Sequence, residues 1–275
     1  PPLWAAMYTT GMFEAKAITV HRMTHPKERT RHMLTDQTMT QLHDMKLHGM
    51  ANAYEEQRQQ AQMAEIDFDE RLGMLVDRQW RWREERALST RLRMAKFKMP
   101  ACMEDINYHA HRGLKRSMMD PLRSGEWIGY HQNVILTGPT GTGKTYLACA
   151  LGTNACRAGY RVKYFVAAKL FRQLRGAHAD GSYMRITDRL AQTDLLILDD
   201  WGLETLKPAE YRDLLEILDD RQGKGATLIT SQLPEELWHD TIGNPTVADA
   251  ILDRLVHNAH KIALEGETMR KPPVA

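Results

Sequence analysis

The sequence predicts an α/β protein, with a five-stranded parallel sheet covered by helices and preceded by a small all-helical N-terminal domain. Five short apolar runs separated by helical stretches support the sheet, because strands buried on both faces are apolar throughout. A glycine-rich segment directly follows the first run, as phosphate-binding loops follow a strand. We expect the strands at residues 133–137, 161–166, 194–199, 226–231 and 260–264.

The chain is expected to have three sections. The first shows no sustained helical or alternating period, and we interpret it as sequence upstream of a natural start at Met33. The second carries apolar positions at helical spacing over about residues 35–62 and 67–98, and Pro100 ends it. The sections are residues 1–32, expected to be disordered, residues 33–99, a helical domain for partner, oligomer or DNA contacts, and residues 100–275, the α/β domain.

The composition is that of an ordinary globular protein. Of the 275 residues, 43% are hydrophobic, and a formal net charge of +2 is too small to indicate a nucleic-acid partner by itself. No apolar run approaches the roughly 20 residues that cross a bilayer, so we expect no membrane partner. Three cysteines without a C-x-x-C pair are typical of a reducing compartment, which predicts a cytoplasmic protein.

Residues 138–145 match the phosphate-binding motif G-x-x-x-x-G-K-[ST], between a predicted strand and a predicted helix. Glycines let backbone amides point at phosphate oxygens, and the helix N-terminus adds a positive partial charge. Lys144 is expected to contact the β- and γ-phosphates, and the Thr145 hydroxyl to bind Mg²⁺. The sequence therefore predicts ATP and Mg²⁺ as cofactors rather than a turn that binds nothing. The nucleotide-binding residues are Gly138, Pro139, Thr140, Gly141, Thr142, Gly143, Lys144 and Thr145.

Two aspartates end the third predicted strand. Asp199 and Asp200 would lie at the carboxyl edge of the sheet, where parallel sheets bind ligands. Asp199 is expected to hold Mg²⁺ together with Thr145, and Asp200 to orient or deprotonate the attacking water. A buried strand that ends in a polar turn is the alternative. The sequence has no N-K-x-D motif, which argues against a GTPase, and paired acids favour ATP hydrolysis over transfer to a metabolite.

The loop and the acids, together with their flanking strings, resemble the AAA+ family, in the branch of DnaA, DnaC and IstB. The string LHDMKLHGM at residues 42–50 and LDDWGL at residues 198–203 are similar to IstB-like transposition helper ATPases. The similarity covers about residues 33–271 and includes segments 129–133 and 265–271. The resemblance implies an AAA+ P-loop NTPase core with a carboxy-terminal lid that is minimal or absent.

The resemblance also implies roles for single residues. Gln232, or less favourably Ser231, stands where the family places a sensor of the γ-phosphate or the water. Arg254 precedes the last strand, where the family carries an arginine finger that reaches a neighbouring subunit's ATP; a solvated arginine is the alternative. Arg270 is the candidate for a second sensor. Many AAA+ proteins have glutamate in place of Asp200. The catalytic set is then Lys144, Asp199, Asp200, Gln232 and Arg254.

Basic residues gather in residues 167–192, where AAA+ initiators carry an extra helical element. Several of them fall on one side of a helix and would neutralise DNA phosphates, although a solvated basic face is the alternative. A denser arginine run at residues 78–98 is compatible with DNA, an acidic partner or plain packing. The candidate DNA contacts are Lys169, Arg172, Arg175, Tyr183 and Arg185.

The function implied by the resemblance is that of an ATP-dependent DNA-binding regulator. Such a protein assembles on double-stranded target DNA as a homo-oligomer with ATP between subunits, deforms the DNA and activates a cognate transposase for insertion. The first alternative is a DnaC-like helicase loader of DNA replication, which shares the ATPase module. The second is a binding module in which ATP is only a structural ligand.

Overall fold

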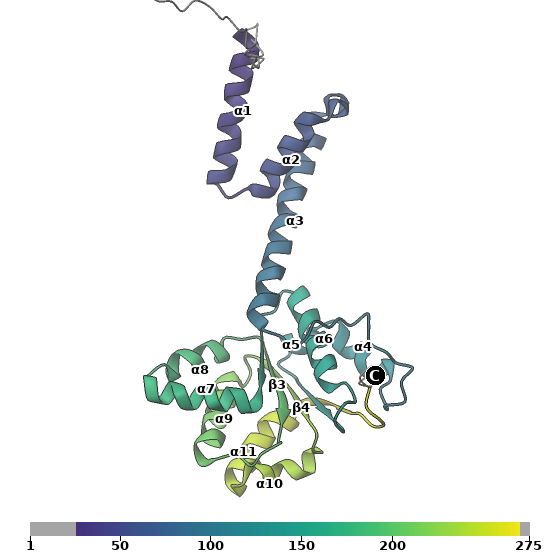
Figure 1. Ribbon diagram of the computed structural model, residues 1–275, viewed down its shortest axis with the longest axis vertical. Coiled ribbons are helices and arrows are strands. Elements are labelled where there is room, and N and C mark those ends of the chain that lie inside the picture. The colour runs from purple at the N-terminus through teal and green to yellow at the C-terminus, as the bar shows by residue number, and fades with distance from the viewer. Residues whose placement is uncertain (1–25, 270–275) are drawn as a thin grey trace, which may run out of the picture. The chain divides into compact units, whose positions relative to one another are not determined.

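The computed structural model describes residues 26–269, with side chains from Thr35 onward, and divides into two compact units. The division falls between Arg83 and Glu84, inside helix α3 (Phe68–Ala95), whereas the sequence places the change of domain between residues 99 and 100. The reason is that Leu88 and Leu92 pack against the core of the second unit. Both belong to the C-terminal part of α3, the helix labelled in Figure 1.

The first unit is helical. It contains α1 (Pro26–Asp44), α2 (His48–Gln59), the short 3-10 helix η1 (Ala61–Glu65) and the beginning of α3. The single helical stretch expected over residues 35–62 is broken by Lys46, whose φ of 60° is left-handed. Helix α1 begins at Pro26, so residues 26–32, which were expected to be disordered, are helical. The same expectation for residues 1–25 lies outside the described residues.

Helices α2 and α3 lie in close contact at Gly49. A Cβ added there would lie 2.7 Å from Trp82 Cβ and 2.9 Å from the Arg78 carbonyl oxygen, so a larger residue would push the helices apart. The Met50 amide donates to the buried Gln79 Oε1 at 3.1 Å. The sequence HGM at the start of α2 therefore sets the packing of this helix pair.

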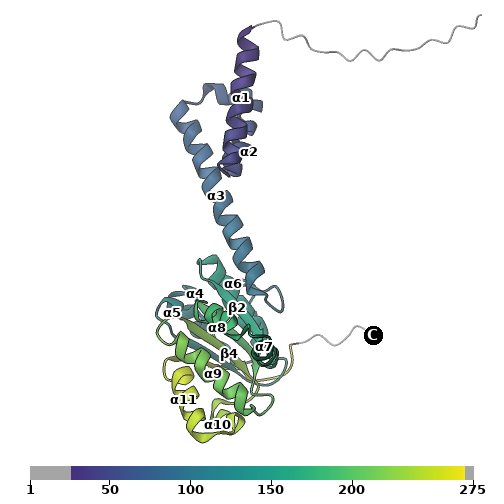
Figure 2. The same cartoon turned by 90° about the vertical axis from the view of Figure 1, so that its left-hand side faces the viewer.

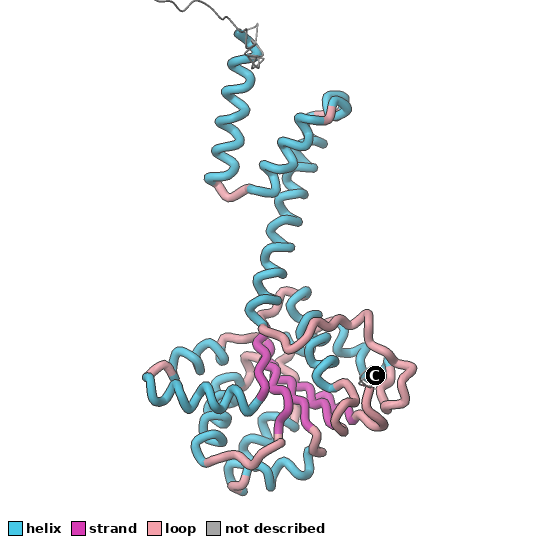
Figure 3. The backbone as a smooth tube through the Cα atoms, in the orientation of Figure 1, coloured by secondary structure: helices cyan, strands magenta, loops and turns pink. Residues whose placement is uncertain are grey.

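The second unit contains one five-stranded sheet, drawn in magenta in Figure 3. All its neighbouring strands are parallel. The strand order β2-β3-β4-β1-β5 confirms the predicted parallel sheet. The predicted ranges agree with the observed ones except at the ends, most clearly for the third strand, which continues through both aspartates. The strands are β1 (Asn133–Thr137), β2 (Val162–Val166), β3 (Leu195–Trp201), β4 (Ala226–Ser231) and β5 (Ala259–Ala263).

Helices cover both faces of this sheet (Figure 2). Side chains alternate between two cores along each strand, so that Leu195 and Ile197 belong to one core and Leu196 and Leu198 to the other. The first core is covered by α4 (Arg116–Arg123), α5 (Glu126–Gly129) and α6 (Lys144–Arg157). The second is covered by α7 (Ala167–Asp180), α8 (Tyr183–Ala191), α9 (Pro208–Arg221), α10 (Trp238–Ile242) and α11 (Pro245–Val256).

The chain after β5 runs back over the phosphate-binding loop, where Leu264, Thr268 and Met269 contact Gly138 and Gly141. Between β5 and Met269, where the description ends, the chain contains no helix. None of the helices within residues 26–269 has the length and apolar content that crossing a bilayer requires.

Candidate active site

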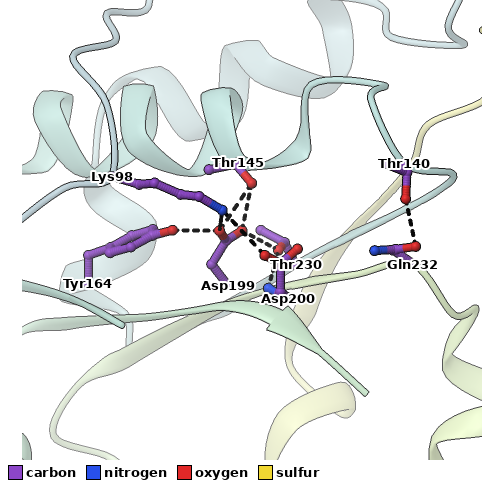
Figure 4. A network of polar contacts seen from close by, with 8 residues as sticks. All are labelled: Lys98, Thr140, Thr145, Tyr164, Asp199, Asp200, Thr230 and Gln232. Atoms are coloured by element: carbon purple, nitrogen blue, oxygen red, sulfur yellow. Dashed lines mark hydrogen bonds and ion pairs between the residues drawn. The ribbon is translucent and has the colours of Figure 1, made fainter. Parts of the chain in front are cut away.

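The phosphate-binding loop and the two aspartates meet at the carboxyl edge of the sheet (Figure 4). The loop connects the end of β1 to the start of α6, and Thr145 lies in the first turn of that helix. Its Oγ1 donates to Asp199 at 2.9 Å from Oδ1 and 3.1 Å from Oδ2. The residues predicted to hold Mg²⁺ are therefore in direct contact.

Two glycines of the loop cannot be replaced by larger residues, both because their φ angles are positive and because the segment after β5 lies too close to leave room for a Cβ atom. Gly138 has φ +138°, and a Cβ on it would lie 2.2 Å from the Leu264 carbonyl oxygen. Gly141 has φ +89°, and its added Cβ would lie 2.1 Å from Thr268 Oγ1. The segment after β5 thus packs against the outside of the loop, and any side chain at these positions would displace it.

Lys144 is the first residue of α6 and is nearly buried. Its Nζ donates to the carbonyl oxygens of Gly138 at 2.6 Å and Pro139 at 2.8 Å. The ammonium group therefore lies across the loop whose amides form the phosphate cradle. A cation held there is placed to bind phosphate oxygens that enter the loop.

Asp199 is fully buried, and a buried carboxylate is stable only when hydrogen-bond donors surround it. Besides Thr145, it accepts from Thr230 Oγ1 at 2.6 Å and from the Tyr164 hydroxyl at 2.5 Å. Burial and this hydrogen bond to Asp199 raise the pKa of Tyr164 far above its ordinary value, so Tyr164 remains a donor. Side chains from β2, β4 and α6 fix the orientation of this carboxylate.

Asp200 adopts the left-handed conformation, with φ 59°, at an irregularity in the pairing of β3 with β4. Aspartate tolerates this conformation better than most residues. The Asp200 amide donates to Thr230 Oγ1 at 3.0 Å instead of to a strand partner. Such a local irregularity re-aims a side chain, and here it turns the second carboxylate toward the cavity beside the loop.

Gln232 follows the end of β4 and also lies at the loop. Thr140 Oγ1 donates to Gln232 Oε1 at 2.7 Å. By contrast, Ser231 is fully buried and its hydroxyl donates to the Trp201 carbonyl oxygen at 2.9 Å. Of the two sensor alternatives, the geometry favours Gln232.

Two cations of the site carry no motif and were missed by the sequence interpretation. Both line the cavity of about 450 Å³ beside the loop. Arg112 is almost fully buried and donates to the Thr142 carbonyl oxygen at 2.9 Å and the Asn107 carbonyl oxygen at 3.0 Å. Burial lowers its pKa. Lys98 lies beside the two aspartates. Arg112 and Lys98 belong to the segment between α3 and β1. The only signal in the sequence of this segment that could have indicated a role for them is its density of basic residues.

Arg254 lies at the opposite, amino edge of the sheet. Its side chain pairs with Asp219 and donates to the Ala250 carbonyl oxygen at 2.6 Å. Its backbone oxygen accepts from Nδ2 of Asn133, the first residue of β1. It therefore does not join the nucleotide site of its own chain. The candidate second sensor, Arg270, lies outside the described residues.

The residues expected to contact DNA lie on α7 and α8. Lys169, Arg172, Arg175 and Arg185 are exposed, and Arg175 donates to Glu210 at 3.0 Å. Tyr183 is half-buried; its ring stacks on His178 at 4.0 Å between centroids, and its hydroxyl donates to Glu216. The four cations are thus open to solvent, whereas the tyrosine hydroxyl is used within the chain.

The fold and the site together define a P-loop nucleotide-binding protein of the AAA+ class. Solved structures agree: DnaI superposes with a TM-score of 0.52 at 19% identity, over 63% of this chain and 95% of that one. DnaA from Aquifex aeolicus, bound to AMPPCP, superposes with a TM-score of 0.50 at 20% identity, over 62% of this chain and 51% of that one. At such low identity these similarities concern the fold alone.

The family is settled by sequence. The model of the IstB-like ATP binding proteins matches residues 40–273, and the chain belongs to this family. The insertion sequence ATP-binding protein y4pL of Sinorhizobium fredii is 49% identical over 239 residues, covering 87% of this chain and 98% of the relative. The IS1162 ATP-binding protein of Pseudomonas fluorescens is 48% identical over 203 residues, covering 74% of this chain and 88% of the relative.

Proposed function

We propose that this chain is a Mg²⁺-dependent ATPase that assembles on double-stranded target DNA, deforms it and activates a transposase for insertion. The observation that carries the proposal is the direct contact of Thr145 with Asp199 beside Lys144 and the glycine-lined loop. The relatives named as insertion sequence ATP-binding proteins favour transposition over the helicase-loader alternative. Three free thiols are consistent with a cytoplasmic protein.

The donor set at the carboxyl edge suits a hard divalent cation. The Thr145 hydroxyl and the Asp199 carboxylate supply oxygen atoms of the kind that Mg²⁺ prefers. When bound, Mg²⁺ neutralises charge that develops on the phosphoryl oxygens. Lys144 binds the phosphates, Asp200 accepts the proton of the attacking water, and Gln232 orients the γ-phosphate or that water.

Arg254 acts in a neighbouring subunit of the oligomer under this proposal. It lies at the amino edge of the sheet and Lys144 at the carboxyl edge, so one chain cannot bring the two together. A second chain that places its amino edge against the loop completes the site. Hydrolysis then requires assembly, because a positive charge supplied in trans stabilises the transition state.

The exposed cations of α7 and α8 bind DNA phosphates under this proposal. Lys169 and Arg172 lie three residues apart on the solvent side of α7, and such spacing places both on one face of a helix. Contacts with the backbone hold DNA without reading its sequence, and many such contacts can offset the free energy of bending the duplex. Binding weakens steeply as salt rises.

ATP turnover measured with and without duplex DNA tests the proposal. We expect turnover that rises when duplex DNA is added, and loss of both nucleotide binding and turnover in Lys144→Ala. The matched control Lys115→Ala, at an exposed lysine that does not line the cavity beside the loop, should behave as wild type. If the wild-type chain shows no ATP turnover, the proposed ATPase activity is wrong. Failure to bind duplex DNA at low salt would remove the transposition function.

A further inference from the structure

Lys98 connects the end of α3 to the acids of the site. Its Nζ lies 3.4 Å from Asp199 Oδ2 and 3.3 Å from Asp200 Oδ2 (Figure 4). The lysine side chain is 44% exposed, whereas Asp199 is fully buried and Asp200 is 27% exposed. One ammonium group thus neutralises part of the charge of two carboxylates from the solvent side.

The backbone around Lys98 is held in place by the core of the second unit. Just before it, Arg91 Nε donates to the Cys156 carbonyl oxygen at 2.8 Å, and Lys163 Nζ donates to the Met94 carbonyl oxygen at 2.7 Å. The Phe97 ring meets the Tyr164 ring edge-on, with 6.5 Å between centroids. Tyr164 is itself hydrogen-bonded to Asp199. The packing that orients the first carboxylate therefore also delivers Lys98 to it.

The ammonium group of Lys98 and a divalent cation would be attracted by the same pair of carboxylates. Two adjacent carboxylates attract any cation, and like charges a few ångströms apart repel each other strongly in a partly buried site. Lys98 is bonded to the Oδ2 atoms of both acids, and Thr145 contacts Asp199 from the side of the loop. A divalent cation bound to this carboxylate pair would weaken the attraction of the pair for Lys98.

We infer that Lys98 is a built-in cation that competes with Mg²⁺ for the Asp199–Asp200 pair and so sets the Mg²⁺ concentration at which the site binds nucleotide. The inference rests on the proposed Mg²⁺–ATP site and adds its regulation. Lys98 is a positioning residue, because it acts on the acids and through them on the metal. Below the threshold that it sets, the acids remain paired with Lys98 and the site is not assembled.

The test is a Mg²⁺ titration of the full chain with a fluorescent, non-hydrolysable ATP analogue at fixed concentration, followed by the fluorescence of the bound analogue. Lys98→Met should lower the Mg²⁺ midpoint about fivefold, the factor that corresponds to an ion pair of about 1 kcal/mol. Lys98→Arg keeps the charge, so its midpoint should stay near the wild-type value. Lys96→Met removes an exposed lysine that makes no contact with the acids, and it should also leave the midpoint unchanged.

Two results would overturn the inference. An unchanged midpoint in Lys98→Met means that Lys98 does not compete with the metal. A raised midpoint, with weaker binding of the analogue at saturating Mg²⁺, means that Lys98 binds phosphate instead. If Lys98→Met does not fold, as judged by thermal unfolding, Lys98→Gln decides by the same criteria. A wild-type chain that binds no analogue at any Mg²⁺ concentration removes the proposed function itself, which is a separate outcome.

Discussion

The two edges of the sheet differ in how complete they are. At the carboxyl edge, the hydroxyls of Thr145 and Thr230 both donate to the Asp199 carboxylate, and Lys144 lies across the loop beside them. At the amino edge, Arg254 is turned toward Asp219 and its own helix. The carboxyl edge brings together most of the predicted nucleotide-binding residues. The amino edge carries Arg254, which lies away from the nucleotide site of the same chain. Under the proposed function, one chain binds the nucleotide and a neighbouring chain supplies the arginine that its own fold keeps away from the loop.

The separation of the two edges follows from strand geometry. All five strands are parallel, so every carboxyl end is at one edge. A strand of five residues such as β1 is about 16 Å long at about 3.3 Å per residue. An arginine at the start of this sheet therefore cannot approach phosphates held at its end.

The largest change in ATP turnover is expected for a substitution of Arg254, at the amino edge. Arg254→Ala should lower ATP turnover of the assembled protein about a thousandfold, because a finger supplied in trans is worth about that much, while nucleotide binding stays unchanged. Turnover and analogue binding measured on the same preparation give the two values. Mixing Arg254→Ala chains with Lys144→Ala chains should restore part of the turnover, since the second variant still carries Arg254. Arg212→Ala, at an exposed position on α9, is the matched control. If the mixture of the two variants recovers no ATP turnover, Arg254 does not act on the nucleotide of a neighbouring subunit.

A second, smaller effect is expected at Asp200, on the complete edge. Asp200→Asn keeps the side-chain size but cannot accept a proton, so turnover should fall about a hundredfold, with binding of ATP retained. Steady-state turnover and a binding titration separate the two steps. Equal losses of binding and turnover would show that Asp200 holds the nucleotide or metal instead of acting on the water.

The third prediction concerns Thr230, which joins the two acids. Its hydroxyl donates to Asp199 and accepts from the Asp200 amide, so Thr230→Val leaves a buried carboxylate short of a donor and a backbone amide without an acceptor. We expect the free energy of unfolding to fall by about 1–3 kcal/mol, measured by denaturant unfolding, and turnover to fall as well. Thr227→Val, on the same strand but near the amino edge, should have a smaller effect. A stable and fully active Thr230→Val would mean that β4 does not position the acids.

The smallest effect is expected on α7, away from both edges of the sheet, and it concerns the affinity for duplex DNA. Lys169→Ala should weaken duplex DNA binding severalfold and reduce the slope of log affinity against log salt by about 0.9, the value for one phosphate contact. Fluorescence anisotropy at several salt concentrations measures both. Because the residue is exposed, ATP binding should not change. An unaltered salt slope would remove Lys169 from the DNA surface.

The contacts among the predicted residues of the candidate site could be expected from the sequence, because these residues lie in two short segments of the chain. The loop of residues 138–145 forms its cradle locally, and Asp199 and Asp200 end an apolar strand whose place in a parallel sheet puts them beside that loop. The predicted helix over residues 35–62 was wrong at Lys46, since a single left-handed residue ends a helix without changing the apolar spacing.

The parallel sheet, the glycine-rich loop and the acid pair could be read from the amino-acid sequence, because apolar runs, glycine spacing and polar residues at strand ends are local properties of the chain. The folded structure was needed to find that Lys98 reaches both acids, that Thr230 orients them and that Arg112 supports the loop. These contacts join residues that lie 30 or more positions apart. The contacts of Lys98 and Thr230 depend on how the segment after α3 and strand β4 pack beside β3, and the contact of Arg112 depends on how the segment before α4 packs against the loop. No local pattern in the sequence records that packing.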